Sequence, residues 1–417
     1  MVRAFFVAIA LALGVNPEAA PPPPEQSATP VPDSILAVLF QEVGPGSALA
    51  RVDPLSLEPS GRRVRLASGG GWATAFSPEH RSLALSGGLG LATVELVDVR
   101  RMRSLGVVDL NTSGTITLLS WHRGYLFAVV DDYEARAVMA IDPVGRQVLA
   151  RHRIAGSILQ AKEATGQVVL LLGPPEGIGP LQLAVVGGKG MASAPIPGFV
   201  GGSRTERRGE DVHTREEIPA LVIDEDGRRA LVFSRGSIAE VSLSNLSVTT
   251  HALAEPASLL DRFRNWLEPP AHAKLVDGFR REGIWLGNGR FAVTGMDYAM
   301  STRGDARGKP SGLALVDTRD WSIRTVAEGG ANLVATEHAL FAFGYDSDDG
   351  IQGYDLRSEK TFRLLPGAAG GLIQIVGGLV YAQLGDGRRF AVIDPLLRRK
   401  IGEAKLGQPI TLVPDLG

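Results

Sequence analysis

Closely spaced carboxylates are the first residues of this sequence that could do chemistry. Asp346, Asp348 and Asp349 alternate with small residues ahead of Gly350. The pattern is similar to part of a calcium-binding loop, because neighbouring carboxylates can bring several oxygens to one hard cation. No glutamate stands where an EF-hand loop would need one. The segment indicates either a calcium site or an ordinary acidic turn between two strands, and calcium is the one cofactor that the sequence suggests.

Two other segments pair a carboxylate with a phenol. Asp131 and Asp132 precede Tyr133, and Asp297 precedes Tyr298 at the corresponding position of another structural unit. A carboxylate and a phenol together can orient a polar ligand through hydrogen bonds. The alternative for both segments is a solvated loop.

The histidines and cysteines limit the chemistry further. None of the seven histidines forms an HxH, HxxxH or HExxH group. His213 stands out because it lies in the charged segment 204–217, for which a solvated loop is the alternative. The sequence has no cysteine, which excludes disulfides, thiolate zinc sites, iron–sulfur clusters and a cysteine nucleophile. No clustered acid–base set appears, and this favours a binding protein over an enzyme.

A repeat supplies the elements that must position these residues. Short hydrophobic strands end in aspartate at six places: Asp53, Asp98, Asp142, Asp317, Asp355 and Asp394. Two degenerate copies, at Val186-Gly187 and Val241-Ser242, fill the long gap. The regular spacing of about 38 to 45 residues is what four short strands and their turns require.

The fifth copy shows the internal pattern of one unit. Strand-forming residues occupy 220–223, 230–233, 238–241 and 247–251, and turn residues separate them. This order predicts a four-stranded antiparallel sheet. One such sheet cannot bury both of its faces, so the units must stack face to face, and a closed ring is the usual solution.

The two ends of the chain complement each other. The first unit begins at Ile35 with its second strand, and residues 409–413 form a first strand with no second strand after it. We therefore predict an all-β fold, a β-propeller of four-stranded blades that the C-terminal strand closes by completing the first blade. The count gives eight blades, with seven as the alternative if the fourth unit is an embellishment.

The units resemble the YVTN and WD-repeat-like β-propellers of bacterial extracytoplasmic proteins. The residues that carry the resemblance are an Asp-Gly or Pro-Glu turn followed by arginine and a hydrophobic strand, as in 226–232, and then the strand that ends in Val-Asp. The resemblance extends over nearly all of residues 34–416 and implies the propeller fold. It implies almost nothing about function.

The N-terminal segment predicts export. An apolar run from Ala4 to Val15 is too short to span a bilayer and fits a secretory signal, so residues 1–20 are predicted to be a signal peptide. A retained anchor is the alternative. Residues 21–33 are rich in proline and indicate an extended linker ahead of the propeller at 34–417. The expected location is secreted, periplasmic or cell-envelope, with no transmembrane span after signal removal.

Long connections are expected on one face of the ring. Segments 173–180, 201–217, 254–281, 296–311 and 345–350 are all predicted to emerge there, whereas the opposite turns are tight. The insertion at 254–281 contains a candidate amphipathic helix at 256–268 with Trp266 in its apolar stripe. That stripe either packs on the ring or contacts a partner. Together with Tyr298 and Tyr345, it would form the binding face.

Charge and motifs lead to two functional hypotheses. With 43 basic and 45 acidic residues the chain has a net charge of −2, which gives no reason to expect a nucleic-acid partner. The leading hypothesis is a non-enzymatic binding or scaffold propeller that presents one face to a protein or polysaccharide partner. The alternative is a propeller hydrolase or lyase with carboxylates and a histidine at the mouth of the central channel.

Overall fold

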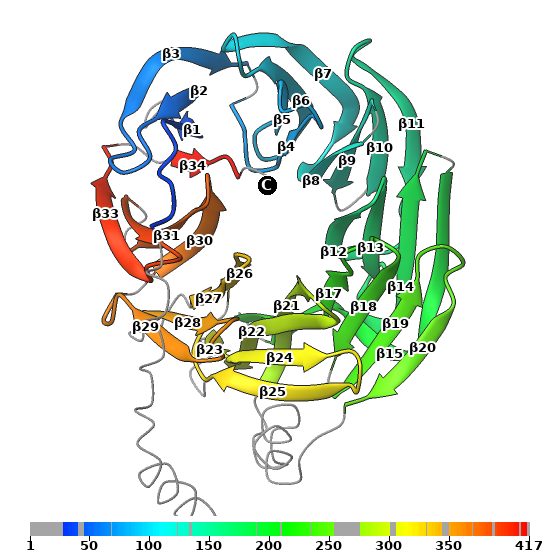
Figure 1. The fold of residues 1–417 in the computed structure, drawn as a ribbon. Coiled ribbons are helices and arrows are strands. Elements are labelled where there is room, and N and C mark those ends of the chain that lie inside the picture. The colour runs from blue at the N-terminus through cyan, green and yellow to red at the C-terminus, as the bar shows by residue number, and fades with distance from the viewer. Residues whose placement is uncertain are drawn as a thin grey trace, which may run out of the picture.

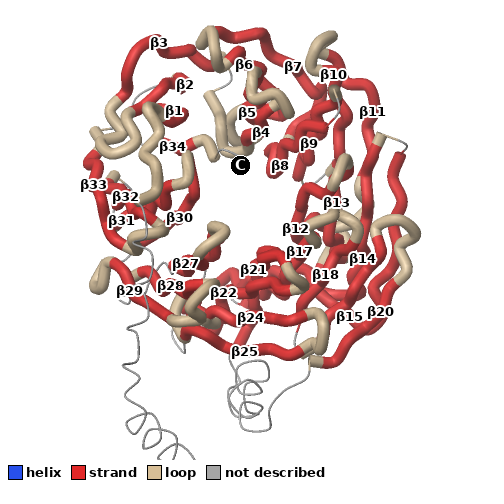
Figure 2. Tube along the Cα trace, in the orientation of Figure 1, coloured by secondary structure: helices blue, strands red, loops and turns tan. Residues whose placement is uncertain are grey.

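The computed structural model describes most of the chain, and the described part is β-structure. The described residues are 28–40, 46–67, 69–122, 124–132, 136–188, 190–208, 211–234, 236–253, 276–300, 306–330, 332–343, 350–368, 370–385, 388–407 and 410–414. These ranges contain 34 strands and no helix (Figure 2). The prediction of an all-β fold is confirmed for them.

The first sheet joins the two ends of the described chain. From the outside of the ring inward, its strands are β3 (Pro59–Leu66), β2 (Ser47–Val52), β1 (Ile35–Phe40) and β34 (Ile410–Leu412) (Figure 1). β34 pairs with β1 in antiparallel register, with Ile410 opposite Leu39. The predicted closure of the first blade by the C-terminal strand is confirmed.

Five other sheets have four strands each. The second sheet contains β4 (Thr74–Phe76), β5 (Ser82–Ser86), β6 (Leu91–Asp98) and β7 (Arg103–Ser113). The third contains β8 (Thr115–His122), β9 (Tyr125–Asp131), β10 (Ala137–Asp142) and β11 (Gln147–Arg153). The next contains β17 (Ala220–Ile223), β18 (Arg229–Ser234), β19 (Ser237–Ser242) and β20 (Val248–Ala252). The fourth of these five sheets contains β26 (Asn332–Ala335), β27 (Ala339–Phe343), β28 (Ile351–Asp355) and β29 (Thr361–Leu364). The last contains β30 (Gly370–Val376), β31 (Leu379–Leu384), β32 (Arg389–Asp394) and β33 (Arg399–Lys405).

The remaining strands form one ten-stranded sheet. Its first half contains β12 (Ser157–Ala164), β13 (Gln167–Gly173), β14 (Gly177–Gly187), β15 (Gly190–Arg208) and β16 (Asp211–Ile218). Its second half contains β21 (Val276–Gly287), β22 (Arg290–Met300), β23 (Ala306–Pro310), β24 (Leu313–Asp317) and β25 (Ser322–Ala327). The halves meet where β16 pairs in parallel with β21, with Glu217 opposite Phe279.

The predicted number of blades is wrong. The structure has six four-stranded blades rather than eight or seven, because the strands between 157 and 327 outside β17–β20 run together into the ten-stranded sheet. Segments expected to be long connections contain strands: 201–208 belongs to β15, 211–217 belongs to β16, and 296–311 contains the end of β22 and all of β23. Backbone pairing between distant segments produced this joining, and a repeat count does not detect it.

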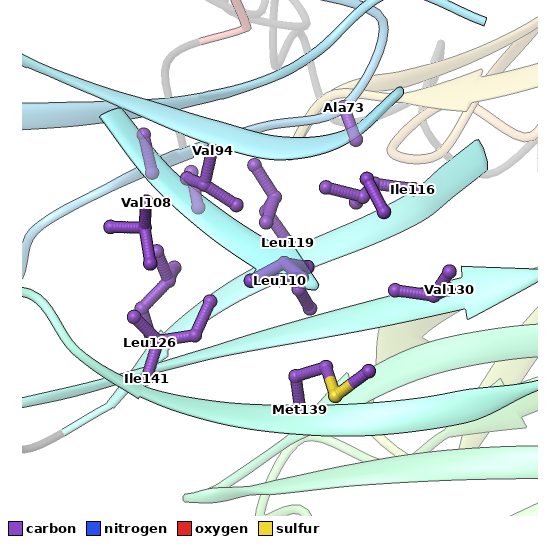
Figure 3. Close-up of a cluster of buried hydrophobic side chains, with 14 of the residues drawn as sticks. Ala73, Val94, Val108, Leu110, Ile116, Leu119, Leu126, Val130, Met139 and Ile141 are labelled. Carbon is purple, nitrogen blue, oxygen red and sulfur yellow. The ribbon is translucent and has the colours of Figure 1, made fainter. Parts of the chain in front are cut away.

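The hydrophobic core lies between neighbouring sheets. Figure 3 shows one cluster, in which Val94 and Val108 of the second sheet face Leu126 and Met139 of the third, all of them almost fully buried. Similar clusters pack both halves of the ten-stranded sheet against the β17–β20 blade. That blade therefore lies between the two halves, and the sheets complete a ring (Figure 1).

The aspartates that mark the repeat cap turns. Each carboxylate accepts hydrogen bonds from backbone N–H groups two or three residues later, as Asp53 does from Leu55 and Ser56 and Asp355 does from Arg357 and Ser358. An aspartate in this position closes a turn by imitating a backbone carbonyl. The repeated residues therefore build the turns between the two outer strands of a blade, on the face opposite the long connections.

Candidate functional site

Extended strands of the ten-stranded sheet pair with one another where the long connections were expected. The β-structure that they form consists of residues 200–208 of β15, 211–218 of β16, 276–281 of β21, 295–300 of β22 and 306–310 of β23, and we refer to it as the ridge. β22 shows how it arises, because residues 290–293 pair with β24 inside the sheet while residues 296–300 pair with β23. The ridge is therefore a continuation of strands that begin inside the ring.

Two glycines allow the ridge strands to approach closely. A Cβ atom on Gly278 would lie 2.0 Å from the carbonyl oxygen of Glu216, and one on Gly295 would lie 2.0 Å from the carbonyl oxygen of Arg280. Real Cβ atoms do not come so close to backbone atoms, so larger residues would push the strands apart. The sequence thus provides glycine where the parallel and antiparallel pairs of the ridge are tightest.

Gln160 ties the base of the ridge to the inner strands. Its amide nitrogen Nε2 donates hydrogen bonds of 2.7 Å to the carbonyl oxygens of both Pro219 and Arg281, and its Oε1 accepts one of 3.1 Å from the N–H of Leu221. One side chain of β12 therefore holds the start of β17 and the middle of β21. Three inner strands are fixed relative to one another at this point.

One side of the ridge carries buried ion pairs. By the strand register, Glu217, Phe279 and Asp297 share this side, and Arg281 lies two residues after Phe279. The guanidinium of Arg281 is 2.7 Å from the carboxylate of Asp297 and lies over the Phe279 ring at 5.1 Å. Arg281 and Glu217 are each only 3% exposed, and Arg215 forms an ion pair with Glu217. These contacts stiffen the ridge.

The other side of the ridge carries polar groups at the start of the inner strands. Tyr298, Arg280, Glu282 and Glu216 share it by register. Burial raises the pKa of Tyr298, and the carboxylates of Glu216 and Glu282 act in the same direction while Arg280 opposes them. The phenol therefore stays protonated at neutral pH and can donate a hydrogen bond.

Lys162 extends this polar group across the inner strands. It comes from β12, whereas Glu282, whose charge acts on it, comes from β21, and β17 lies between these two strands. Burial lowers the pKa of Lys162, and Glu282 partly restores it. Basic, acidic and phenolic groups thus meet within one region, and such a mixture can recognise a polar partner of either charge.

The structure separates the carboxylates that the sequence singled out. Asp297 pairs with Arg281 on the buried side of the ridge, and Tyr298 lies on its polar side. Asp131 is 2.9 Å from Arg136 within the β8–β11 blade, and Asp132 accepts a hydrogen bond from Ser113 at the end of β7 in the neighbouring blade. Their carboxylates are used in local contacts.

Several predicted residues cannot be placed. Trp266 and the candidate helix at 256–268, Tyr345, and the acidic group Asp346, Asp348 and Asp349 lie outside the described residues, as do residues 1–27. The backbone of His213 belongs to β16, opposite Glu206. The calcium site therefore stays a prediction.

Sequence reasoning missed four residues of this region: Gln160, Lys162, Arg280 and Glu282. They lie on β12 and β21, more than a hundred positions apart, and a single sequence has no local signal for their meeting.

Within the described ranges no group of three histidine or carboxylate side chains has metal-binding geometry. Nor does the described part of the chain contain a helix that is long and apolar enough to cross a membrane.

Comparisons with known proteins support the fold. No protein-family model and no curated protein matches the sequence. Among solved structures, dihydro-heme d1 dehydrogenase NirN in complex with DHE has a TM-score of 0.55 and 14% identity, covering 95% of this chain and 78% of that chain. Citrobacter koseri AztD has a TM-score of 0.49 and 12% identity, covering 92% and 99%. BamB from Moraxella catarrhalis has a TM-score of 0.46 and 11% identity, covering 87% and 91%.

At these identities the likeness shows the fold alone. The predicted resemblance to β-propeller proteins is confirmed at that level, since the described strands form a propeller ring. Membership of the YVTN or WD-repeat families has no support from a family model.

Proposed function

We propose that this chain is a non-enzymatic, extracytoplasmic binding propeller whose ridge face receives a protein or carbohydrate partner. The observation that carries the proposal is the ridge itself. Strands of the ten-stranded sheet continue past their pairing partners in the ring and join through β16 and β21 into one continuous β-structure. The opposite face has turns capped by aspartate and no such structure among the described residues.

The ridge is suited to binding because it is already ordered. Its strands are joined by backbone hydrogen bonds, packed at Gly278 and Gly295, and tied to the ring by Gln160. A surface ordered in advance loses little conformational entropy when a partner docks. A loop of the same length would lose more.

The chemistry of the polar side favours a polar partner. The phenol of Tyr298 can donate a hydrogen bond, Arg280 and Lys162 supply positive charge, and Glu216 and Glu282 supply negative charge. Neither sign dominates, so the surface matches the mixed polar groups of a folded protein or a glycan better than a polyanion.

Site-specific photocrosslinking in the native host tests the proposal. A photoreactive phenylalanine replaces Ser203, which is exposed on β15 within the ridge, and in a second strain it replaces Val144, which is 89% exposed on the opposite face. We expect the Ser203 position to yield a discrete crosslinked species that mass spectrometry identifies as a protein or glycan. Crosslinks from Val144 alone, or from neither position, would contradict the proposal.

Export belongs to the same proposal and has its own test. The apolar run from Ala4 to Val15 supports it. Mass spectrometry of the chain purified from its native host should find an N-terminus beyond this run. An intact Met1 in a cytoplasmic fraction would show that the protein is not exported.

A further inference from the structure

A cavity of about 230 Å³ opens at the centre of the ring, away from the ridge. Four innermost strands contribute to it: β30, β34, β4 and β8, which belong to consecutive sheets around the ring (Figure 1). Its polar and aromatic lining is made by Trp72, Thr74, Thr117, Gln374 and Thr411. The C-terminal strand thus completes a cavity wall as well as the first blade.

The lining of this cavity is neutral. The hydroxyls of Thr74 and Thr411 and the amide of Gln374 can each donate and accept hydrogen bonds, whereas the Thr117 hydroxyl donates to the carbonyl oxygen of Val129 at 3.4 Å and can accept one. None of the described residues that line the cavity is ionisable. A charged ligand would lose hydration there without gaining an opposite charge. The cavity therefore favours a ligand rich in neutral hydroxyl or amide groups.

Trp72 adds a broad apolar surface beside these polar groups. Its side chain is part of the cavity lining and yet the residue is 61% exposed. Phe40 stacks on it, with ring centroids 5.6 Å apart and an interplanar angle of 25°. Phe40 thereby supports the indole from one side, while much of the residue stays open to solvent and is accessible to a ligand.

The loop that carries Trp72 is held firmly. A Cβ atom on Gly70 would lie 2.0 Å from the carbonyl carbon of Gly87, and one on Gly71 would lie 2.8 Å from a methyl group of Val38. The next residue, Ala73, donates its N–H to the Ser86 hydroxyl at 3.0 Å. Gly70 and Gly71 thus let the chain pack tightly just before the exposed tryptophan.

From this juxtaposition we propose that the cavity binds a neutral saccharide unit, which stacks on Trp72 and hydrogen-bonds to Thr74, Thr117, Gln374 and Thr411. A sugar ring has an apolar C–H face that fits an indole and hydroxyls around its edge that fit threonine and glutamine. The volume is below the roughly 300–1,000 Å³ of sites for drug-sized ligands, which suits one ring of a longer glycan. The proposal rests on the proposed function in taking the chain to be a binding propeller, and it names carbohydrate as the ligand class of a second site, away from the ridge.

A glycan array tests the ligand class directly. The purified chain is applied to arrayed neutral hexose and N-acetylhexosamine oligosaccharides alongside sialylated and uronic-acid glycans. We expect binding to neutral glycans, confirmed by calorimetric titration with the best one in solution. Binding to acidic glycans alone, or to none, would overturn the proposal.

Three variants locate the binding. Trp72→Ala should weaken the affinity by about tenfold or more, Trp72→Phe should retain part of it, and Gln374→Ala should weaken it without removing the stacking surface. Tyr125→Ala is the matched control, because Tyr125 is also an exposed aromatic residue (46%) but lies on the opposite face. Equal melting temperatures establish that each variant is folded. Glycan binding that survives Trp72→Ala would overturn the proposal.

The two proposals fail in different ways. If the Ser203 position crosslinks a partner but no neutral glycan binds, the saccharide site is wrong and the binding propeller stands. If a neutral glycan binds through Trp72 but Ser203 yields no crosslink, the ridge is not the docking surface and the saccharide site stands.

Discussion

The side-chain amide of Gln160 donates a 2.7 Å hydrogen bond to the carbonyl oxygen of Arg281, 121 positions later in the chain. The same nitrogen also reaches Pro219, so a single glutamine connects the two halves of the ten-stranded sheet across the blade that separates them. The residue lies at the point where inner strands leave the ring and become the ridge. Its contacts explain how a long sheet with two distant halves keeps one geometry.

Replacing Gln160 should loosen the base of the ridge. Gln160→Glu keeps the size of the side chain but removes both donated hydrogen bonds, leaving two backbone carbonyls without this donor. We expect a loss of about 2 kcal/mol or more in the free energy of unfolding, measured by urea denaturation. Gln147→Glu, on an exposed position of β11, is the control and should change stability little. Equal stabilities of the two variants would show that the Gln160 contacts are unimportant.

Gly278 should not tolerate a side chain. In Gly278→Ala the new methyl group would lie 2.0 Å from the carbonyl oxygen of Glu216, so β16 and β21 would have to separate. We expect a loss of at least about 2 kcal/mol in unfolding free energy and faster hydrogen exchange in β16. Gly188→Ala is the matched control, since a Cβ there meets nothing within 4 Å. A stable Gly278→Ala variant with unchanged exchange would refute the tight pairing of the ridge.

Removing the closing strand should destabilise the whole ring. Deletion of residues 408–417 takes away Ile410, Leu412 and Val413, which are at most 7% exposed, and uncovers β1. Burial of each such side chain contributes about 1.5–3 kcal/mol, so we expect a clearly lower melting temperature by calorimetry. Deletion of residues 415–417 alone serves as the control. A long deletion that melts like the full chain would disprove the closure.

Acid should weaken one of the repeat turns. The hydrogen bond from the Arg319 side chain, opposed in part by burial, lowers the pKa of Asp317 from 3.8 to about 2. Because the pKa is lower in the folded state, the stabilisation is complete above pH 4 and is lost as the pH falls toward 2. Arg319 is largely exposed, so solvent screening keeps the effect small.

A comparison of the chain with Asp317→Asn checks this prediction. The difference in unfolding free energy between the two proteins should be constant from pH 7 to pH 5 and should shrink between pH 4 and pH 3. A difference that does not change with pH would mean that the carboxylate of Asp317 is not held by Arg319.

Local patterns predicted the blade interior well. The fifth copy shows this, since strands were expected at 220–223, 230–233, 238–241 and 247–251. The structure has β17 to β20 within one residue of these bounds at every end. Alternating hydrophobic residues and turn residues act over a few positions, so one sequence reveals them. The aspartates of the repeat were recognisable for the same reason, because they bond to their own turns.

The polar side of the ridge was predicted only in part. Tyr298 was selected from its neighbours in sequence and lies on this side, and its contact with a partner stays a prediction. Lys162 and Glu282 were missed because they lie far apart in the sequence and come close only in the folded ring. Trp72 was also missed, although three consecutive glycines before an aromatic residue are a signal for a tightly packed loop that displays a side chain.

The sequence by itself determined the all-β character, the repeat and the closure of the ring by the C-terminal strand. Hydrophobic alternation and turn residues are local patterns, so they can be recognised in one sequence. The strand missing from the first unit matches the extra strand at the other end of the chain. Only the tertiary structure decided that β16 pairs with β21, that six blades stand apart as four-stranded sheets, and which side chains line the central cavity. Backbone hydrogen bonds make the β16–β21 pair, and they join polar segments as readily as apolar ones. The pairing therefore leaves no pattern of side chains from which it could have been foreseen.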